Sequence, residues 1–378
     1  MMNMKLLHNE LIDWYEVNHR ILPWRETDDP YKIWISEIIL QQTRVAQGME
    51  YYMRFVERFP DIQSLADAEE DEVLLYWQGL GYYSRARNLH KAAQLMKNHE
   101  IFHQAMRREG EEAIRREGEE IFAALKSMPG VGDYTAGAIA SFAFDLPYPA
   151  LDGNVYRVLS RLYDCEIAFD TTQGKKHFRQ LAEELLDRER PRLFNSAIME
   201  LGALHCVPTA PDCHTCPLNT WCKALANHTV ELLPVRKPRP KVRDRYLEYT
   251  IYITPERTTL IHQRKGNDIW KHLWEFVETT SVDLKNDNID NLRGNQLPAA
   301  LQGKNSTQPY TTLHHSTQPL AIQLTHVLSH QKLHARFEIK NVSELPEIPD
   351  TVVVKLSDLD NYAFSRLTLK AIEFLAQR

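Results

Sequence analysis

The sequence MPGVGDYTAGAIA, at residues 128–140, predicts a tight glycine turn followed by an apolar helix. Gly130 and Gly132 supply the turn, because glycine adopts backbone conformations that other residues avoid. Tyr134 stands at the start of the helix. A turn at a helix N-terminus presents backbone N–H groups with no partner inside the helix, and these suit a phosphate oxygen. We therefore interpret the stretch as a phosphate-binding hairpin, with a plain helix–turn–helix as the alternative.

Residues 1 to about 225, on both sides of this hairpin, carry the pattern of helices. Apolar residues recur there at spacings of three and four, whereas the alternation typical of a strand is scarce. The helical spacing is found in the ranges 31–47, 71–77, 85–97, 134–144, 154–163 and 176–187. We therefore expect this region to be mostly α-helical.

A basic, proline-rich stretch at 226–245 is predicted to be a solvated, extended linker. Its basic residues are Arg236, Lys237, Arg239, Lys241, Arg243 and Arg245. After it, YLEYTIYIT at 246–254 alternates as a strand does, and so does the segment around 335–339. We expect a second domain of mixed α and β structure over 246–378, with a long polar loop near 281–312.

An internal repeat precedes the hairpin. RREGEEAI at 107–114 is followed at once by RREGEEIF at 115–122. Opposite charges four residues apart suit an exposed helical extension, despite the glycine in each copy. We interpret the repeat as a tolerated surface insertion, with a partner-binding role as the alternative.

The composition of the whole chain is that of a globular protein, with 43% hydrophobic and 25% charged residues. The net charge of −6 argues only weakly against a nucleic-acid partner, because DNA-binding surfaces are local. No run of 18 apolar residues occurs, and the N-terminus lacks the features of a signal peptide. We expect a cytoplasmic monomer (associated with the nucleoid in a bacterium) that has no membrane partner.

Four of the five cysteines are clustered as Cys206-x6-Cys213-x2-Cys216-x5-Cys222. In a reducing compartment such close spacing favours a metal site over disulfides. Four thiolates suit either tetrahedral zinc or a four-iron cluster, and the spacing alone does not choose between them. The fifth, Cys165, lies in a helical stretch and is interpreted as a small buried hydrophobe.

Two carboxylates stand in contrasting surroundings. Glu37 lies on a helix that is apolar nearly all round, so burial is expected to raise its pKa and suit it to act as a general acid. The alternative is a buried glutamate paired with an arginine. Asp152 opens another helix, either as a simple N-cap or as an N-cap that also reaches a cleft. One protonated and one ionised carboxylate form the pattern that cleaves glycosidic bonds.

In this order, the hairpin, the two carboxylates and the cysteine loop resemble the helix–hairpin–helix DNA glycosylases that have a C-terminal iron–sulfur loop. Four motifs resemble more narrowly the MutY-type adenine glycosylases: LPWR at 22–25, SEIILQQT at 36–43, GLGYY at 79–83 and LDGNV at 151–155. The resemblance implies double-stranded DNA as partner and a [4Fe–4S] cluster on the four clustered cysteines.

The resemblance also implies how the region 1–225 is divided. A six-helix lobe is expected over about 23–150, with the hairpin at 127–137. A second lobe, which holds the cluster, is expected to combine 1–22 with 151–225.

The resemblance implies roles for individual residues of the active site. Glu37 matches the acid that protonates N7 of adenine, and Asp152 matches the carboxylate that stabilises the cationic sugar. Tyr134 matches a residue that hydrogen-bonds near that carboxylate, and Asn154 matches a further polar group. The related endonuclease III enzymes carry a lysine in place of Tyr134, and its amine permits strand cleavage. We therefore expect a monofunctional glycosylase that leaves an abasic site.

Other matched positions are implied to contact DNA. Trp24, Arg25 and Leu40 match the pocket for the extruded adenine. Gln42 and Tyr82 match residues that push into the base stack beside 8-oxoguanine. The remaining DNA-binding positions are Thr43, Gly130 and Gly132.

Residues 246–378 resemble the Nudix-like domain that recognises 8-oxoguanine, because WKHLWEF at 270–276 fits its LWEF signature. The Nudix catalytic helix pattern is missing from the sequence, so phosphohydrolase activity is not expected. VLSH at 327–330 aligns with a Phe-Ser-His loop that reads the lesion, which implies that His326, Ser329 and His330 contact it. Leu328 replaces the phenylalanine of that loop.

The function expected from these matches is removal of adenine that faces 8-oxoguanine or guanine. One alternative is a bifunctional lyase that acts on oxidised pyrimidines, but Tyr134 and the C-terminal domain argue against it. The other is a DNA-binding iron–sulfur module without enzymatic activity, in which the carboxylates are structural. The stretch 224–245 contains one histidine and no cysteine, so the zinc-binding linker of some relatives is not expected.

Overall fold

The computed structural model describes residues 3–98, 118–238, 242–283 and 320–377. The chain forms two compact units, each built from two stretches of sequence. The first unit combines Met1–Asp67 with Asn88–Pro238, and the second combines Ala68–Arg87 with Arg239–Arg378. Most of the RREGEE repeat, and the predicted polar loop beyond Asp283, lie outside the described residues.

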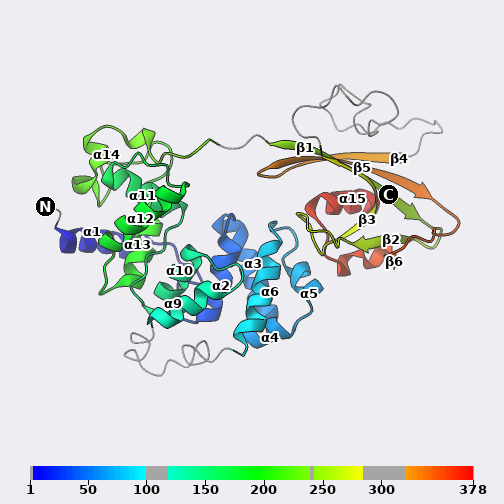
Figure 1. The fold of residues 1–378 in the computed structure, drawn as a ribbon, viewed down its shortest axis with the longest axis horizontal. Coiled ribbons are helices and arrows are strands. Elements are labelled where there is room, and N and C mark those ends of the chain that lie inside the picture. The colour runs from blue at the N-terminus through cyan, green and yellow to red at the C-terminus, as the bar shows by residue number, and fades with distance from the viewer. Residues whose placement is uncertain (1–2, 99–117, 239–241, 284–319, 378) are drawn as a thin grey trace. The chain divides into compact units, whose positions relative to one another are not determined.

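The first unit is helical over its described residues (Figure 1). Its helices are α1 (Met4–Asn18), α2 (Pro30–Leu40), α3 (Val45–Arg58), α4 (Ile62–Asp67), α9 (Gly118–Ser127), α10 (Asp133–Phe144), α11 (Gly153–Tyr163), α12 (Thr172–Leu185), α13 (Pro191–Leu204) and α14 (Lys223–Ala226). Two short 3-10 turns, η1 (Asn219–Trp221) and η2 (Val230–Leu232), flank α14. Helix α6 (Ser84–Met96) begins in the second unit and ends in the first. The prediction of a helical region is confirmed.

Helices α2 and α10 pack against each other and are apolar on nearly every side. All residues of α10 from Thr135 to Phe144 are buried, and α2 is buried along most of its length. Asp29 is the N-cap of α2, and its carboxylate accepts a hydrogen bond from the backbone N–H of Tyr31 (2.9 Å). Pro30 is the first residue of the helix, a position that suits proline. A polar group in the buried part of either helix, such as Glu37 of α2, therefore lies inside the protein.

The prediction of one helix over 31–47 is wrong. Helix α2 ends at Leu40, and α3 begins only at Val45. Between them Gln42 adopts a positive φ of 59°, which no helix accommodates. Apolar spacing continues across this turn, so periodicity alone did not reveal the break. The turn places Gln42 and Thr43 at the end of α2 rather than on its side.

A second apolar core joins α1 to the helices after Asp152. Leu7 and Leu11 of α1 pack with residues of α11, α12 and α13, among them Leu159, Phe178 and Phe194. Cys165 belongs to this core and is buried, as predicted, but it follows the end of α11 rather than lying in a helix. The N-terminal helix is thus packed against a part of the chain that lies well over a hundred residues away.

The second unit is built on a six-stranded sheet with the order β4-β5-β1-β3-β2-β6. The strands are β1 (Arg243–Ile253), β2 (Thr258–Gln263), β3 (Trp274–Asp283), β4 (Leu320–Val327), β5 (Gln331–Asn341) and β6 (Thr351–Lys355). Strands β1 and β5 are parallel, and the other neighbours are antiparallel. The helices of this unit are α5 (Glu70–Tyr76), η4 (Leu356–Asn361) and α15 (Arg366–Ala376). The prediction of an α+β domain after the helical region is confirmed.

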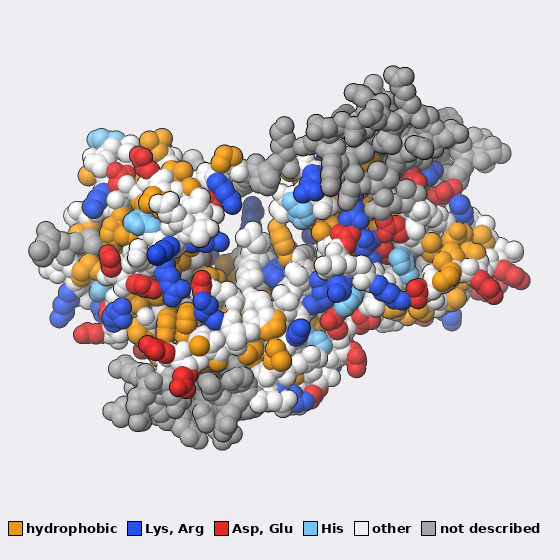
Figure 2. Space-filling model, in the orientation of Figure 1, with side chains coloured by type: hydrophobic (Ala, Val, Ile, Leu, Met, Phe, Trp, Pro, Cys, Tyr) orange, Lys and Arg blue, Asp and Glu red, His pale blue; other side chains and the backbone are white. Residues whose placement is uncertain are grey.

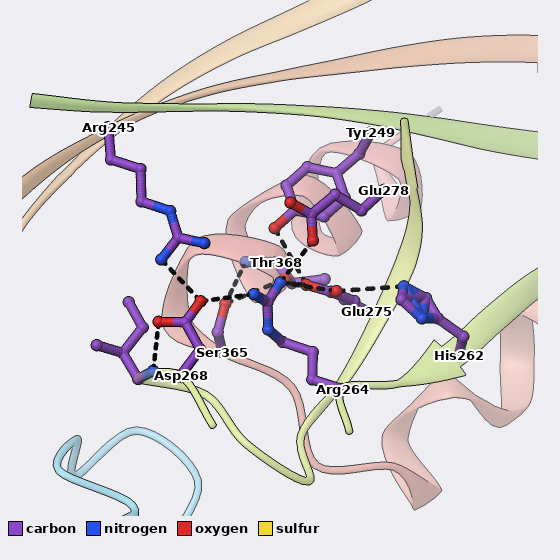
Figure 3. Close-up of polar contacts among 10 residues, drawn as sticks. Arg245, Tyr249, His262, Arg264, Asp268, Glu275, Glu278, Ser365 and Thr368 are labelled. Carbon is purple, nitrogen blue, oxygen red and sulfur yellow. Dashed lines mark hydrogen bonds and ion pairs between the residues drawn. The ribbon is translucent and has the colours of Figure 1, made fainter. Parts of the chain in front are cut away.

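The last basic residues of the predicted linker lie in this sheet, because β1 begins at Arg243. Arg245 is buried and pairs with Asp268 (Nη1–Oδ2 2.7 Å), so it is not a solvated linker residue. Figure 3 shows the polar cluster to which both residues belong. Its centre is Arg264, which binds Glu275, Glu278 and Asp268 at 2.7–2.8 Å. These ion pairs hold the loop between β2 and β3 against the sheet.

Glu275 is the most deeply buried carboxylate of this cluster. Burial raises its pKa to about 7, although the Arg264 guanidinium acts in the opposite direction. Tyr249 donates a hydrogen bond to it (3.1 Å), and its ring stacks on Phe337. Glu275, Arg264 and Tyr249 thus form a polar network inside the unit. Removal of one of them leaves a buried polar group without a hydrogen-bond partner, which is unfavourable.

Acidic and basic side chains are interspersed over the face seen in Figure 2. The net charge of −6 therefore does not describe the local character of either unit. Within the described ranges, no helix is both long and apolar enough to cross a membrane.

Candidate active site

A cavity of about 560 Å³ opens in the first unit. The predicted residues that line it are Trp24, Arg25, Glu37, Leu40, Gln42, Thr43, Tyr134, Asp152 and Asn154. These come from the segment before α2, from the end of α2, and from the first turns of α10 and α11. A cavity of this size suits a small organic ligand.

Glu37 of α2 is buried, lines the cavity and makes two polar contacts. The Tyr134 hydroxyl donates a hydrogen bond to Glu37 Oε2 at 2.5 Å. Arg25 Nη1 lies 3.4 Å from Oε1, and its guanidinium also covers the Phe142 ring at 3.8 Å. The arginine partner that the sequence left as an alternative is therefore present, and it coexists with a place in the cavity wall.

Asp152 is the N-cap of α11 and also lines the cavity, which is the second of the two interpretations. Its Oδ1 accepts a hydrogen bond from Val155 N, and its Oδ2 accepts one from Asn154 Nδ2, each 2.8 Å long. Burial raises the pKa of Asp152, and the negative charge of Glu37 acts in the same direction. The two hydrogen bonds lower that pKa, because they favour the ionised form.

Tyr134 links the two carboxylates electrostatically. It is half-buried in the cavity wall, and burial together with the charges of Glu37 and Asp152 raises its pKa well above the usual value. Its hydroxyl therefore keeps its proton and acts as a hydrogen-bond donor rather than as an anion. The distance of 97 residues between Tyr134 and Glu37 in sequence shows that only folding brings them together.

Residues of α13, of α1 and of the segment after α1 form a wall of the cavity that the sequence did not reveal. They are Tyr15, Arg20, Ser196, Met199, Glu200 and Ala203. Arg20 donates three hydrogen bonds to Glu200, from its backbone N (3.0 Å), Nε (2.6 Å) and Nη2 (2.8 Å). Burial raises the pKa of Glu200, but the bonds from Arg20 outweigh it and the net shift is downward. No local pattern could reveal this pair, because its members are 180 residues apart.

The glycine turn lies outside the cavity. Gly130 has a φ of 79°, which favours glycine, and Gly132 is the N-cap of α10 without a side-chain cap. A Cβ added at Gly132 would meet no atom within 4 Å, so the start of α10 is open to an approaching group. This geometry suits a backbone phosphate, and its contact with DNA stays a prediction.

The four clustered cysteines line one small cavity beside Arg161. Arg161 Nη1 lies 3.3 Å from Cys206 Sγ, and the same guanidinium donates to three backbone carbonyls around the loop. Burial raises the pKa of Cys216 to about 12, and the neighbouring thiols act in the same direction. A cationic group inside the cavity would reverse this effect and favour the thiolates.

Cys206, Cys213, Cys216 and Cys222 all line this one cavity. Among the described residues, no three His, Cys, Asp or Glu side chains form a group that could hold a metal ion. A zinc ion needs four ligands that meet at a single centre. In a four-iron cluster each cysteine binds a different iron atom, so the ligands stay further apart. Four thiols that line one cavity are a donor set that either group can use.

The remaining predicted residues lie in the second unit. Tyr82 is 51% exposed in the loop before α6. Ser329 and His330 are exposed in the turn between β4 and β5, with Ser329 Oγ 3.3 Å from His330 Nδ1. His326, at the end of β4, lies against Trp270 with ring centroids 6.4 Å apart. Burial lowers the pKa of His326, and the positive charges of Lys370 and Arg366 add to this.

Comparison with known proteins agrees with both parts of the fold. The sequence model of the HhH-GPD superfamily base excision DNA repair proteins matches residues 35–188, and that of the NUDIX domain matches residues 249–374. A solved thermostable thymine-DNA glycosylase superposes with a TM-score of 0.50 at 25% identity, over 59% of this chain and 97% of that one. The part of the second unit that follows residue 239 is therefore a Nudix-like domain, as the resemblance implied.

Curated relatives extend the match to nearly the whole chain. Adenine DNA glycosylase of Buchnera aphidicola subsp. Schizaphis graminum is 31% identical over 342 residues, which span 89% of this chain and 93% of that protein. Adenine DNA glycosylase of Buchnera aphidicola subsp. Baizongia pistaciae is 33% identical over 282 residues, or 73% and 75% of the two chains. This chain therefore belongs to the adenine DNA glycosylase family of the HhH-GPD superfamily, and is a DNA N-glycosylase with a Nudix-like domain.

Proposed function

We propose that this protein removes adenine that faces 8-oxoguanine, or guanine, in double-stranded DNA, and that it leaves an abasic site. The observation that carries the proposal is the meeting of Glu37, Tyr134 and Asp152 at one cavity that is large enough to admit a nucleobase. A glycosidic bond inside a duplex cannot be reached, so the adenine must be extruded into this cavity. Trp24 and Leu40 supply apolar surface for the extruded base.

The two carboxylates divide the reaction between them. Glu37, positioned by Tyr134 and Arg25, gives a proton to N7 of the adenine. The bond between N9 and the sugar carbon then breaks, and both of its electrons leave with the neutral base. Asp152, whose ionised form is favoured by the hydrogen bonds from Val155 N and Asn154, stabilises the cationic sugar. Water bonds to the sugar carbon, and its proton returns to Glu37.

The reaction ends at the abasic site. A lyase would need an amine that attacks the sugar and forms a Schiff base. Among the described residues that line the cavity none is a lysine, and Tyr134 occupies the position that the resemblance assigns to that amine. Its raised pKa keeps the phenol protonated, so it does not replace the amine as a nucleophile.

DNA is held by contacts that the reaction itself does not use. The glycine turn at Gly130 and Gly132 binds a backbone phosphate. Gln42 and Tyr82 press into the base stack beside the lesion, with Thr43 next to them. The exposed turn between β4 and β5 carries Ser329 and His330 and reads the oxidised base, with His326 supporting it from β4. Leu328 gives this turn an apolar tip in place of an aromatic one.

The four clustered cysteines hold a [4Fe–4S] cluster. A [4Fe–4S] cluster bound there would link the four cysteines of the loop 206–222, and Arg161 of α11 donates a hydrogen bond to Cys206 Sγ. Its role would be structural, because the cysteine cavity is separate from the one that contains Glu37 and Asp152. The protein acts as a monomer.

The test is a single-turnover incubation with duplexes that carry one adenine opposite 8-oxoguanine, guanine or thymine, with and without later alkali. Wild type is compared with Asp152→Asn and Glu37→Gln. The matched control is Glu183→Gln on α12, outside the cavity. Strand breaks that appear only after alkali, only opposite the purines, and not in the two cavity variants support the proposal.

Three results contradict it. Strand breaks without alkali, with a protein–DNA adduct trapped by borohydride, would establish a lyase. Equal release of adenine opposite thymine would remove the lesion-directed specificity. Full DNA affinity without any base release by the wild type would indicate that the protein is a DNA-binding module without enzymatic activity.

A further inference from the structure

The loop that carries Tyr82 has an unusual backbone. Gly79 and Gly81 have φ values of 96° and 76°, and Tyr82 itself has a φ of 49°, which is rare for a residue with a side chain. Tyr82 nevertheless projects into solvent, with 51% of its surface exposed. Backbone strain of this kind persists only where surrounding contacts hold the segment in place.

Those contacts converge on the backbone of one residue, Phe364. Its N–H donates a hydrogen bond to Gln78 Oε1 (2.7 Å), and its carbonyl accepts one from the Tyr83 hydroxyl (3.2 Å). Gln78 and Tyr83 stand immediately before and after the loop of residues 79–82. The Tyr83 hydroxyl also accepts a hydrogen bond from Gly79 N (3.2 Å), which closes the base of the loop.

Phe364 is a firm support. It is 1% exposed, its ring stacks on Phe276, and it forms a parallel bridge with Trp274 of β3. The next residue, Ser365, is the N-cap of α15. The Tyr82 loop is thus fastened to the point where the sheet and the last helix of the Nudix-like domain meet.

The rest of the segment 68–87 is fastened to the same domain. His272 Nδ1 lies 2.5 Å from Glu70 Oε1, and the Trp274 indole donates to Asp71 at 3.3 Å. At the other end, Arg87 donates to the Lys271 carbonyl (2.8 Å). Lys271 and His272 belong to the loop between β2 and β3, and the ion pairs of Arg264 hold that loop in place (Figure 3).

These contacts explain why the segment 68–87 belongs to a different compact unit from the residues that precede and follow it in sequence. Residues 68–87 fall within the range that matches the HhH-GPD superfamily, yet they form one compact unit with the Nudix-like domain. The exposed turn that carries Ser329 belongs to that same unit. The Tyr82 loop and the Ser329 turn, which match different family models, therefore belong to one compact unit.

We propose that the Nudix-like domain positions Tyr82, and that Gln78 and Tyr83 are the positioning residues that fix its loop on the Phe364 backbone. The proposal rests on the proposed function, in which Tyr82 presses into the stack beside 8-oxoguanine. Lesion reading at Ser329 and insertion at Tyr82 are then parts of one recognition event. Loss of either contact with Phe364 leaves the Tyr82 side chain unchanged, but its loop is then no longer held in one conformation.

The test uses the full-length protein and a duplex that has 2-aminopurine next to 8-oxoguanine and a non-cleavable adenine analogue opposite the lesion. Insertion of Tyr82 opens the base step, and the fluorescence of 2-aminopurine rises. Tyr83→Phe and Gln78→Met are compared with Tyr82→Ala, which removes the inserted side chain. Tyr362→Phe is the matched control, because it deletes a hydroxyl two residues from Phe364 while the Tyr362 ring still packs on Trp274.

We expect Tyr82→Ala to abolish the rise and Tyr83→Phe to reduce the preference for 8-oxoguanine over guanine about tenfold, as the loss of two hydrogen bonds implies. Gln78→Glu keeps an acceptor for Phe364 N and should restore the signal that Gln78→Met loses. Tyr362→Phe should behave as wild type. DNA affinity opposite guanine and the thermal midpoint check that Tyr83→Phe is folded.

The possible failures are distinguishable. If Tyr82→Ala keeps the fluorescence rise, Tyr82 does not insert, and this part of the proposed function fails together with the inference. If Tyr82→Ala loses the rise but Tyr83→Phe and Gln78→Met keep it, the role of Tyr82 stands and the positioning role is overturned. A loss in Tyr362→Phe as large as that in Tyr83→Phe would also overturn it.

Discussion

Replacing Asn154 with alanine tests how the site keeps Asp152 ionised. Asn154 Nδ2 donates one of the two hydrogen bonds that lower the pKa of Asp152 against the effect of burial. Without it the carboxylate loses a partner that only its ionised form uses fully. The pKa of Asp152 therefore rises further. Since the reaction needs the carboxylate, activity is lost as the pH falls through that pKa, and the acid limb of the rate profile moves to higher pH.

The size of the shift follows from the bond that is removed. A hydrogen bond to a charged group contributes about 1.5–3 kcal/mol. Asp152 lines an open cavity, where water replaces part of the lost amide, so the low end of the range, about 1.5 kcal/mol, applies. One pKa unit corresponds to about 1.4 kcal/mol, so the acid limb should move upward by about one pH unit.

The assay is single-turnover adenine release from a duplex with adenine opposite 8-oxoguanine, measured between about pH 4.5 and 9, a span that brackets ordinary carboxylate and histidine titration. Met199→Leu is the control, because Met199 lines the same cavity without a hydrogen bond to Asp152. We expect its acid limb to coincide with that of the wild type. A lower plateau in Asn154→Ala with an unmoved acid limb would refute the reasoning, because Asn154 would then act on the substrate and not on Asp152.

Three other outcomes are expected. Glu37→Gln should lower the rate of adenine release at least about 100-fold while DNA affinity stays near that of the wild type, as loss of a general acid implies; a loss of binding measured by fluorescence anisotropy would indicate a structural role instead. Cys216→Ser should lower the iron content and the absorbance near roughly 410 nm together with the thermal midpoint, whereas zinc in the purified wild type would contradict the cluster. Arg264→Met should lower the free energy of unfolding, measured by urea denaturation, by about 3–5 kcal/mol, because it leaves the buried Glu275 without its arginine partner. The surface variant Lys265→Met should change that free energy by less than about 0.5 kcal/mol. Equal effects of the two variants would refute the role of the buried network.

The sequence by itself determined the features that depend on local spacing. Apolar periodicity predicted α10, and the glycines before it predicted the turn at Gly130, because both depend on residues a few positions apart. The alternation in YLEYTIYIT predicted β1 for the same reason. The positions of the site residues came from the family resemblance, and nine of them line the cavity. Periodicity failed at Gln42, where the apolar pattern runs on through a turn.

Only the tertiary structure decided which distant residues meet. The hydrogen bond from Tyr134 to Glu37, and the pair of Arg20 with Glu200, depend on how whole helices pack, and no local pattern encodes packing across 97 or 180 residues. The same holds for the segment 68–87, whose sequence matches one family while Gln78 and Tyr83 bind a backbone in the other. Hydrogen bonds to a backbone amide leave no signature in the partner's sequence, because every residue type except proline offers the same N–H and C=O groups.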